Sequence, residues 1–292
     1  MFSTPTLKGR RVLVTGAARG IGALLSERLH LEGARVALLG LEPELLEDVA
    51  GRCGDAPWFE CDIADREHVE VAVEAAVAAL GGLDVFVANA GIAAQLPLLG
   101  GDPTVMERTI AVNLIGSYYT IRAAGPHISH PGGYALLVSS MASAVHLPLM
   151  GAYSASKAGV EALGNTLRIE LSGTGAKVGV AYFSELDTDM TSRGFGTEAA
   201  KKLVGDGAFT RITPVEVAIR SVTAGIARRS RRIVVPRQLV PVLPTRMLAQ
   251  RVIDVAARRN LRAALEIARR ERVDFTTPQP TDDREATVGS SR

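Results

Sequence analysis

The amino-acid sequence predicts an α/β protein, with a single doubly wound parallel sheet of about seven strands followed by a C-terminal helical extension. Two observations predict this fold. Short apolar runs alternate along the chain with longer segments whose apolar residues recur at helical spacing, as in repeated strand–helix–strand units. The runs also lack strict polar alternation, which is typical of parallel strands covered on both faces. The predicted strands are residues 11–15, 35–39, 58–61, 83–88, 134–139, 178–183 and 232–235.

Residues 1–236 are expected to form one domain, because no break in composition interrupts the strand–helix rhythm before that point. Pro236, Pro241 and Pro244 then punctuate a linker, and residues 237–275 are expected to form a basic helical extension. The last residues, 276–292, are polar, contain two prolines and are predicted to be disordered.

The extension is rich in arginine, and two interpretations of it stay open. A basic amphipathic element could contact a membrane surface or a partner. The interpretation that we favour is a helical segment with a solvated basic face. It would pack against the domain through six apolar residues: Leu248, Val252, Val255, Leu261, Leu265 and Ile267.

Composition argues against several other classes of protein. The 292 residues carry a net charge of only +2, which does not indicate a nucleic-acid-binding protein. Cys53 and Cys61 are too few for a disulfide framework, and His127 and His130 lack partners at ligand spacing, so no metal site is expected. The sequence shows neither the apolar core of a signal peptide nor a membrane-spanning stretch, so a cytoplasmic location is expected.

A glycine-rich turn follows the first predicted strand, with Gly16, Gly20 and Gly22 spaced as G-x-x-x-G-x-G. Gly16 permits a sharp turn, Gly20 lets the backbone approach a pyrophosphate, and Gly22 lets the next helix pack closely on the strand. The N-terminus of that helix favours phosphate charge. A purely structural turn is the alternative, but the strand before it and the helix after it favour a dinucleotide site.

Tyr153 and Lys157 stand four residues apart in a predicted helix, and Ser140 precedes the tyrosine by thirteen residues. Positions i and i+4 share one helix face, so the ammonium is expected beside the phenol. A positive neighbour favours the phenolate and lowers the tyrosine pKa, as acid–base catalysis near neutral pH requires. A tyrosine and a lysine at this spacing also occur often by chance. Whether they form a catalytic pair therefore depends on the motifs in the rest of the chain.

The ordered set of motifs resembles the short-chain dehydrogenase/reductase family. It comprises TGAARGIG at 15–22, Asp62-Ile63 after the third predicted strand, ANAG at 88–91, Asn113 in VNLIG, Ser140, and YSASK at 153–157. Order and spacing both match the family, over roughly residues 8–236. The resemblance implies a Rossmann-type fold and an NAD(P)-dependent oxidoreductase that interconverts a secondary alcohol and a ketone.

The resemblance also implies which residues bind the cofactor. The glycine turn would line the pyrophosphate, Asp62 and Ile63 would bracket the adenine, and the ANAG segment would pass the adenosine ribose. Thr188 would reach the nicotinamide carboxamide or the phosphates. The full set implied is Gly16, Arg19, Gly20, Ile21, Gly22, Asp62, Ile63, Asn89, Ala90, Gly91, Tyr153, Lys157 and Thr188.

In the family, the end of the second strand separates NAD(H) from NADP(H). An acidic residue there accepts from the ribose 2′-hydroxyl and repels a 2′-phosphate, and the matching residue here is Gly40. Arg19 stands where NADP-binding members often carry a basic residue, and arginine pairs well with phosphate. Leu41 replaces a second residue that is often arginine, and Glu42 is two positions past Gly40. On balance NADP(H) is favoured over NAD(H).

The family mechanism would make Tyr153 the general acid or base, with Lys157 lowering its pKa and bonding the nicotinamide ribose. Ser140 would hold the substrate oxygen and the developing alkoxide. Asn113 would hold a water that links Lys157 to solvent. Ser139 competes for the serine role, but the thirteen-residue spacing favours Ser140.

Two positions depart from the family pattern. Phe183-Ser184 stands where members usually have Pro-Gly after the sixth strand, in a loop that shapes the nicotinamide pocket. Ser143 stands where many members have glycine. These changes are expected to adjust the pocket without removing a catalytic group.

Substrate contacts are expected from loops at the carboxyl ends of the strands, at residues 92–99, 141–151 and 186–212. The first two loops are apolar, which favours a hydrophobic alcohol or ketone. By resemblance, residues 104–124 and 153–171 would form the interface of a homodimer or homotetramer. The alternative function is a nucleotide-sensing regulatory protein on the same fold, which would have no need of the set Asn113, Ser140, Tyr153 and Lys157.

Overall fold

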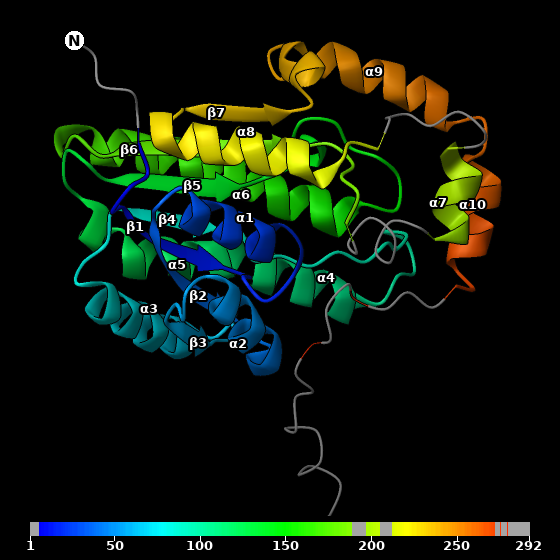
Figure 1. The fold of residues 1–292 in the computed structure, drawn as a ribbon. Coiled ribbons are helices and arrows are strands. Elements are labelled where there is room, and N and C mark those ends of the chain that lie inside the picture. The colour runs from blue at the N-terminus through cyan, green and yellow to red at the C-terminus, as the bar shows by residue number, and fades with distance from the viewer. Residues whose placement is uncertain (1–5, 189–196, 205–211, 272–274, 276–278, 280–292) are drawn as a thin grey trace, which may run out of the picture.

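The computed structural model describes residues 6–188, 197–204, 212–271, 275 and 279. This part of the chain contains a seven-stranded, fully parallel sheet in the order β3-β2-β1-β4-β5-β6-β7 (Figure 1). Each strand lies within two residues of its predicted range, so the predicted doubly wound α/β fold is confirmed. The strands are β1 (Arg11–Thr15), β2 (Arg35–Gly40), β3 (Trp58–Glu60), β4 (Val85–Ala88), β5 (Tyr134–Val138), β6 (Lys177–Phe183) and β7 (Arg232–Val235).

Helices cover both faces of the sheet. The core on one face is formed with α1, α2 and α8, and the core on the other face with α3, α5 and α6. Successive strand residues face opposite cores: Val12 and Val14 lie in the first, and Leu13 lies in the second. The helices are α1 (Gly20–Leu31), α2 (Pro43–Arg52), α3 (Arg66–Leu80), α4 (Pro103–Ile110), α5 (Gly116–Ala124), α6 (Gly151–Glu170), α7 (Glu198–Val204), α8 (Val215–Arg228), α9 (Arg246–Ala257) and α10 (Leu261–Ala268).

The helical segment predicted at 104–124 is divided by a π-helical turn. Helix α4 begins after Asp102, whose carboxylate accepts from the Thr104 backbone N–H at 2.9 Å. The π turn spans Ala111–Ile115 and leads into α5. It widens the helix at Asn113, whose side chain is fully buried.

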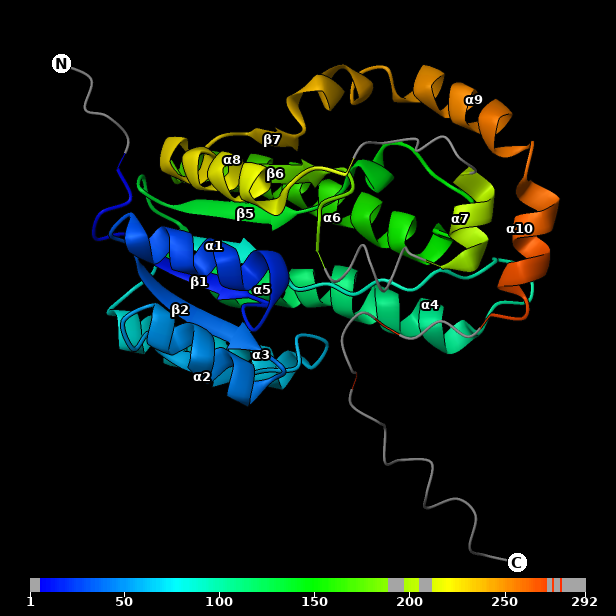
Figure 2. The ribbon, with the colours of Figure 1, turned by 45° about the vertical axis from the view of Figure 1, so that its right-hand side comes forward.

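The C-terminal extension leaves the sheet after β7 and forms α9 and α10. Figures 1 and 2 show α7 and α10 side by side at the edge toward which the strands point, with α9 leading to them from β7. The prediction that α9 packs against the domain through its apolar residues was wrong. Leu248, Val252 and Val255 are 65%, 63% and 69% exposed. The α9 side chains with polar contacts to the domain are Arg246 and Gln250 instead, while Leu261, Leu265 and Ile267 on α10 are half-buried.

Residues beyond α10 are described only in part. The side chain of Phe275 packs against the core shared by α3, α5 and α6, and Gln279 accepts a hydrogen bond from Arg108 Nε at 2.8 Å. The disorder predicted for 276–292 otherwise falls outside the described residues. Among the described helices, none is both long and apolar enough to cross a membrane.

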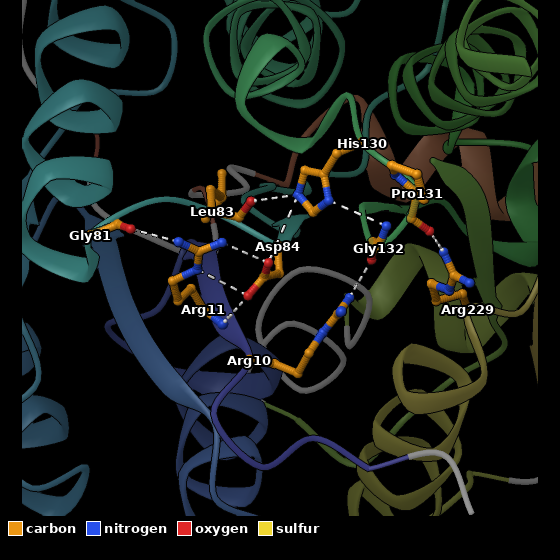
Figure 3. Close-up of polar contacts among 9 residues, drawn as sticks. All are labelled: Arg10, Arg11, Gly81, Leu83, Asp84, His130, Pro131, Gly132 and Arg229. Carbon is orange, nitrogen blue, oxygen red and sulfur yellow. Dashed lines mark hydrogen bonds and ion pairs between the residues drawn. The ribbon is translucent and has the colours of Figure 1, made fainter. Parts of the chain in front are cut away.

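A polar network ties together the amino ends of the central strands, away from the glycine turn (Figure 3). Asp84 precedes β4, and its carboxylate accepts from the backbone N–H of Arg11 at 2.9 Å and from its guanidinium at 2.8 and 3.0 Å. His130 Nε2 lies 3.2 Å from the Leu83 carbonyl oxygen, and Arg10 donates to the Gly132 carbonyl at 2.6 Å. The loop before β5 is thereby joined to the starts of β1 and β4.

Candidate active site

A cavity of about 650 Å³ opens at the carboxyl ends of the strands. Strand order reverses between β1 and β4, the place where open α/β sheets bind ligands. The site residues predicted from the sequence that line the cavity are Gly16, Arg19, Gly20, Ile21, Asp62, Ile63, Asn89, Ala90, Gly91, Ser140, Tyr153, Lys157 and Thr188. Of the predicted residues, Gly22 and Asn113 do not line this cavity.

The glycine turn has the geometry that its sequence requires. Gly16 and Gly20 adopt φ values of +64° and +55°, which other residues rarely adopt. A Cβ on Gly22 would lie 2.0 Å from the Gly16 carbonyl oxygen, so α1 can begin this close to the turn only with glycine there. A Cβ on Gly20 would meet no atom within 4 Å, and this residue lines the cavity. The turn therefore leaves room for a phosphate group beside its backbone.

Asn89 fixes the turn to the neighbouring strand. Its Nδ2 donates to the Thr15 carbonyl at 3.0 Å and to the Gly16 carbonyl at 3.3 Å. The Thr15 hydroxyl in return accepts from the backbone N–H groups of Asn89 and Ala90, each at 3.1 Å. The ends of β1 and β4 are thus held together at the point where the cavity opens.

Two ion pairs lie along the part of the cavity predicted to hold the adenosine. Arg19 pairs with Glu42, with Nε and Oε2 2.9 Å apart. Asp62 accepts from Arg108 Nη2 at 2.9 Å and from the Ala64 backbone N–H at 2.9 Å. Sequence reasoning missed Arg108, which is 46 residues from Asp62, and it did not anticipate that Glu42 would pair with Arg19.

Ser140 and Tyr153 are joined by a hydrogen bond between their side chains. The Ser140 hydroxyl also lies 3.2 Å from the Phe183 carbonyl oxygen and accepts from the Ala142 backbone N–H at 3.1 Å. Ser139 points elsewhere, because its hydroxyl donates to the Lys157 carbonyl at 2.8 Å. Of the two serines, Ser140 is therefore the one whose side chain contacts the tyrosine.

Lys157 lies next to Tyr153 on α6, with its Nζ 5.7 Å from the centre of the tyrosine ring. Its ammonium donates to the Val138 carbonyl at 3.0 Å. Asn113 approaches from the π turn: its Nδ2 donates to the Ile92 carbonyl and to the Ser156 hydroxyl, each at 3.0 Å. A Cβ on Gly91 would lie 3.2 Å from Asn113 Oδ1 and 3.3 Å from Lys157 Nζ, so these two side chains converge on Gly91.

Burial dominates the electrostatics of the tyrosine–lysine pair. It raises the pKa of Tyr153 to about 12, against a smaller lowering effect of the bond from Ser140. It lowers the pKa of Lys157 to about 8. The lowered tyrosine pKa expected from the neighbouring ammonium is therefore not observed, because removing both groups from water disfavours their charged forms more strongly.

The two departures from the family pattern both lie close to Ser140. Phe183 supplies the carbonyl oxygen that Ser140 contacts, and Ser184 lines the cavity. The Ser184 hydroxyl oxygen is buried without a hydrogen-bond partner among the described residues. Ser143 donates to the Ser140 carbonyl at 2.7 Å, which fixes the backbone of the turn after β5.

The remainder of the cavity wall is mainly apolar. Its polar exceptions include Gln95, whose Oε1 accepts from the Thr197 hydroxyl at 2.5 Å. Of the third predicted loop, residues 189–196 and 205–211 lie outside the described part, but α7 between them lines the cavity. Sequence reasoning also missed Ile253 of α9 as a wall residue. The apolar lining comprises Ile92, Met141, Ala142, Val145, Leu147, Pro148, Met150, Leu186, Ala200, Leu203 and Ile253.

These residues fit a dinucleotide with a reactive ring near Tyr153. The open space at Gly20 suits a phosphate, and the cavity runs without interruption from there to Ser140, Tyr153 and Lys157. In the described residues, no group of three or more histidine, cysteine, aspartate or glutamate side chains could hold a metal ion.

Comparison with known proteins gives the family. The model of the short chain dehydrogenase family matches residues 10–193, which is more than half of the chain. The chain therefore belongs to the short-chain dehydrogenase/reductase family of oxidoreductases, which use nicotinamide cofactors.

Individual relatives agree with this assignment. The chain is 33% identical to D-threitol dehydrogenase of Mycolicibacterium smegmatis, over 74% of this chain and 85% of the relative. It is 31% identical to (+)-borneol dehydrogenase 1 of Salvia officinalis, over 59% and 67%. The crystal structure of a dehydrogenase/reductase from Sinorhizobium meliloti 1021 superposes with a TM-score of 0.70 at 30% identity, covering 79% of this chain and 96% of that one.

Proposed function

We propose that this protein transfers a hydride between NADP(H) and an apolar secondary alcohol or ketone. The observation that carries the proposal is the convergence of Ser140, Tyr153 and Lys157 on one cavity that continues to the glycine turn. A cofactor bound along the turn would have its phosphates at Gly20 and its reactive ring near Tyr153. When bound, the nicotinamide supplies or accepts the hydride at the substrate carbon.

The side chains of Ser140 and Tyr153 would hold the substrate oxygen. A hydrogen bond joins the two side chains, and with substrate bound each hydroxyl would donate to the substrate oxygen in place of that bond. Tyr153 keeps its proton at neutral pH because burial raises its pKa to about 12. In the reductive direction it gives this proton to the oxygen as the carbon receives the hydride, and in the oxidative direction it takes the proton back.

Lys157 would stabilise the tyrosinate that the proton transfer leaves. Its ammonium lies on the same helix face as the phenol and is itself nearly fully buried. Charges interact strongly in such surroundings because little water screens them. Asn113 would hold a water that links Lys157 to solvent, and its Oδ1 and the Lys157 Nζ both approach Gly91 closely.

The apolar wall supports a hydrophobic substrate. Apolar side chains make up most of the cavity wall outside the predicted cofactor residues, while its polar members include Gln95, Glu185 and Lys201. Among the relatives, (+)-borneol dehydrogenase 1 is named for an apolar bicyclic alcohol, whereas D-threitol dehydrogenase is named for a polar one. The lining of this chain's cavity favours the first kind.

The preference for NADP(H) rests on Arg19 and Gly40. Both line the cavity, and Gly40 brings no carboxylate to the ribose. Glu42 competes for the guanidinium, so a 2′-phosphate would share or displace an existing ion pair. Arg19→Ala should therefore weaken NADPH binding by roughly tenfold with little change for NADH, and Glu42→Gln should strengthen NADPH binding.

Cofactor titrations of the wild type and both variants, followed by quenching of Trp58 fluorescence or by calorimetry, measure these effects. Tighter binding of NADH than of NADPH to the wild type would contradict the preference and leave the reaction class intact. The reaction class is tested by mixing the protein with each reduced cofactor and a series of apolar ketones, while the absorbance of the reduced ring is followed. No oxidation of either cofactor by any ketone would refute it.

A further inference from the structure

We propose that the C-terminal extension forms one wall of the substrate chamber, and that Ile253 on α9 limits the size of the ketone that fits. The inference rests on the proposed function, since it concerns the substrate end of the same cavity. Ile253 lines this cavity together with Ser140 and Tyr153. It lies 60 residues beyond the family match, which ends at residue 193.

The extension lies beyond the region that the family model matches. The dehydrogenase/reductase from Sinorhizobium meliloti 1021 aligns over 96% of its own length but only 79% of this chain, so about a fifth of this chain has no counterpart there. A wall residue in such a segment can differ between relatives while the catalytic residues stay the same. The extension therefore offers this chain its own means of selecting substrates.

Helix α9 is held against the domain by two polar contacts on its inner face. Arg246 pairs with Glu161 of α6 at 2.9 Å, and the Glu161 side chain is only 10% exposed. Gln250 binds the backbone of His146 twice: its Oε1 accepts from the N–H at 2.7 Å, and its Nε2 donates to the carbonyl at 3.0 Å. Ile253 follows Gln250 by three residues, so it lies on this inner face.

The Gln250 contact also fixes a second part of the wall. His146 is followed directly by Leu147 and Pro148, which both line the cavity. A side-chain amide that binds both polar groups of one peptide residue sets the position of the loop without requiring a particular side chain at 146. Helix α9 thus places its own residue in the wall and positions the loop opposite.

Helix α10 holds a third part of the wall. The carboxylate of Glu271, just after α10, accepts from the backbone N–H groups of Glu198 and Ala199 at 2.8 and 3.1 Å, which caps α7. Leu203 of α7 is buried against Ala257 and Ala264 of the extension. Because Ala200 and Leu203 line the cavity, the extension supports α7 from behind.

Ile253 separates the chamber from a smaller cavity. This second cavity, of about 230 Å³, lies between α9 and the loop at His146, and Ile253 and Pro148 line both cavities. Shortening Ile253 would join the two spaces and lengthen the chamber. Enlarging it would fill part of the chamber without changing any residue expected to bind the cofactor.

Two substitutions and one control test the wall. Ile253→Trp should reduce the space and Ile253→Ala should extend it, whereas Val252→Trp alters the exposed face of the same helix, 63% exposed and outside both cavities. The measurement is binding of cyclohexanone and of the larger 2-decalone to the protein saturated with NADP⁺, by calorimetry. A ketone and an oxidised cofactor cannot react, so this binding is read without turnover. Turnover of both ketones with NADPH is followed in parallel.

The expected result is that Ile253→Trp weakens 2-decalone binding about tenfold or more and cyclohexanone binding less. Ile253→Ala should shift the preference toward 2-decalone, and Val252→Trp should match the wild type. Equal ketone affinities in the wild type and Ile253→Ala, or no binding of either ketone to the wild type, would overturn the inference. If Ile253→Trp does not fold, the ketone affinities of Ile253→Ala alone test the inference. Binding that follows the expected order without turnover would instead refute only the proposed reaction.

Discussion

Tyr153 and Lys157 share one face of α6, and burial moves their pKa values in opposite directions. The pKa of Tyr153 rises to about 12, so the tyrosine keeps its proton throughout the physiological range. A proton donor for ketone reduction must do so. The pKa of Lys157 falls to about 8, so the lysine is the member of the pair that changes its charge near neutral pH. The pH dependence of the reaction should therefore report the lysine.

Ketone reduction should slow as pH rises through about 8. In the proposed mechanism, protonated Lys157 would stabilise the tyrosinate left by proton transfer, and this charge is present below the lysine pKa and lost above it. We expect a kcat that is level below the lysine pKa and falls with the loss of one proton above it, measured for reduction at saturating cofactor and ketone. A profile that stays level up to about pH 10, the ordinary range of a lysine, would contradict this role.

At the scale of the secondary-structure elements, the two ends of the sheet differ: the candidate active site lies at one end, and a polar network that joins the strands lies at the other. The carboxyl ends of the strands carry the glycine turn and Ser140, whereas the amino ends carry the network around Asp84. Burial would raise the pKa of Asp84, but the bonds from Arg11 outweigh it and the pKa is lowered overall. Asp84 therefore stabilises the fold as a carboxylate.

Asp84→Asn should lower stability at neutral pH by about 1–3 kcal/mol and leave cofactor affinity unchanged. A depressed pKa in the folded state contributes stability above the unfolded value of about 4, and this contribution disappears as pH falls through the folded pKa. Melting curves at several pH values should show a difference between wild type and variant that narrows below about pH 4. A difference that is constant from neutral to acid pH would argue against a charged Asp84.

A structural feature could be predicted from the sequence where neighbouring residues determine it, and could not where contacts between distant residues determine it. The strands were placed within two residues because burial on both faces leaves an apolar run in the sequence itself. Ser140 and Tyr153 were paired through the family resemblance, because their thirteen-residue spacing matches that of the family. The face of α9 that packs was not predictable: Leu248 and Val252 are apolar but exposed, and Gln250 makes the contact because a backbone loop far away in sequence offers both polar groups.

Ion pairs between segments far apart in the sequence could not be predicted either. Arg108 meets Asp62 only after α4 and the end of β3 come together in the fold, and neither residue's neighbours in sequence indicate the other. Such pairs follow from tertiary packing rather than from propensity or periodicity. The roles assigned to Asp62 and Asn113 consequently remain predictions, although both side chains have defined partners in the structure.

At the scale of the whole molecule, apolar side chains remain exposed on the helical face that the family resemblance associates with assembly. Ile115 in the π turn, Tyr118 on α5 and Ile169 on α6 are 36%, 46% and 76% exposed. A second copy of the chain would cover such residues. We therefore expect a homodimer or homotetramer built on α5 and α6.

Light scattering should show a dimer or tetramer for the wild type, and the double variant Tyr118→Glu, Ile169→Glu should have a smaller mass. Charged groups cannot be buried unpaired in an apolar interface without a large cost. Leu31→Glu is the matched control, because Leu31 is 78% exposed on α1 and should not affect assembly. A monomeric wild type, or a double variant of unchanged mass, would contradict this interface.

The central claim is that the molecule uses Tyr153 to move a proton while a bound nicotinamide moves a hydride. The most direct measurement compares Tyr153→Phe with the wild type in a single turnover of NADPH and an apolar ketone, with NADPH affinity measured alongside. Phenylalanine keeps the ring and removes only the hydroxyl, so the rate should fall by roughly 10²–10⁴-fold while NADPH affinity stays close to that of the wild type. Turnover by Tyr153→Phe at the wild-type rate would contradict the account.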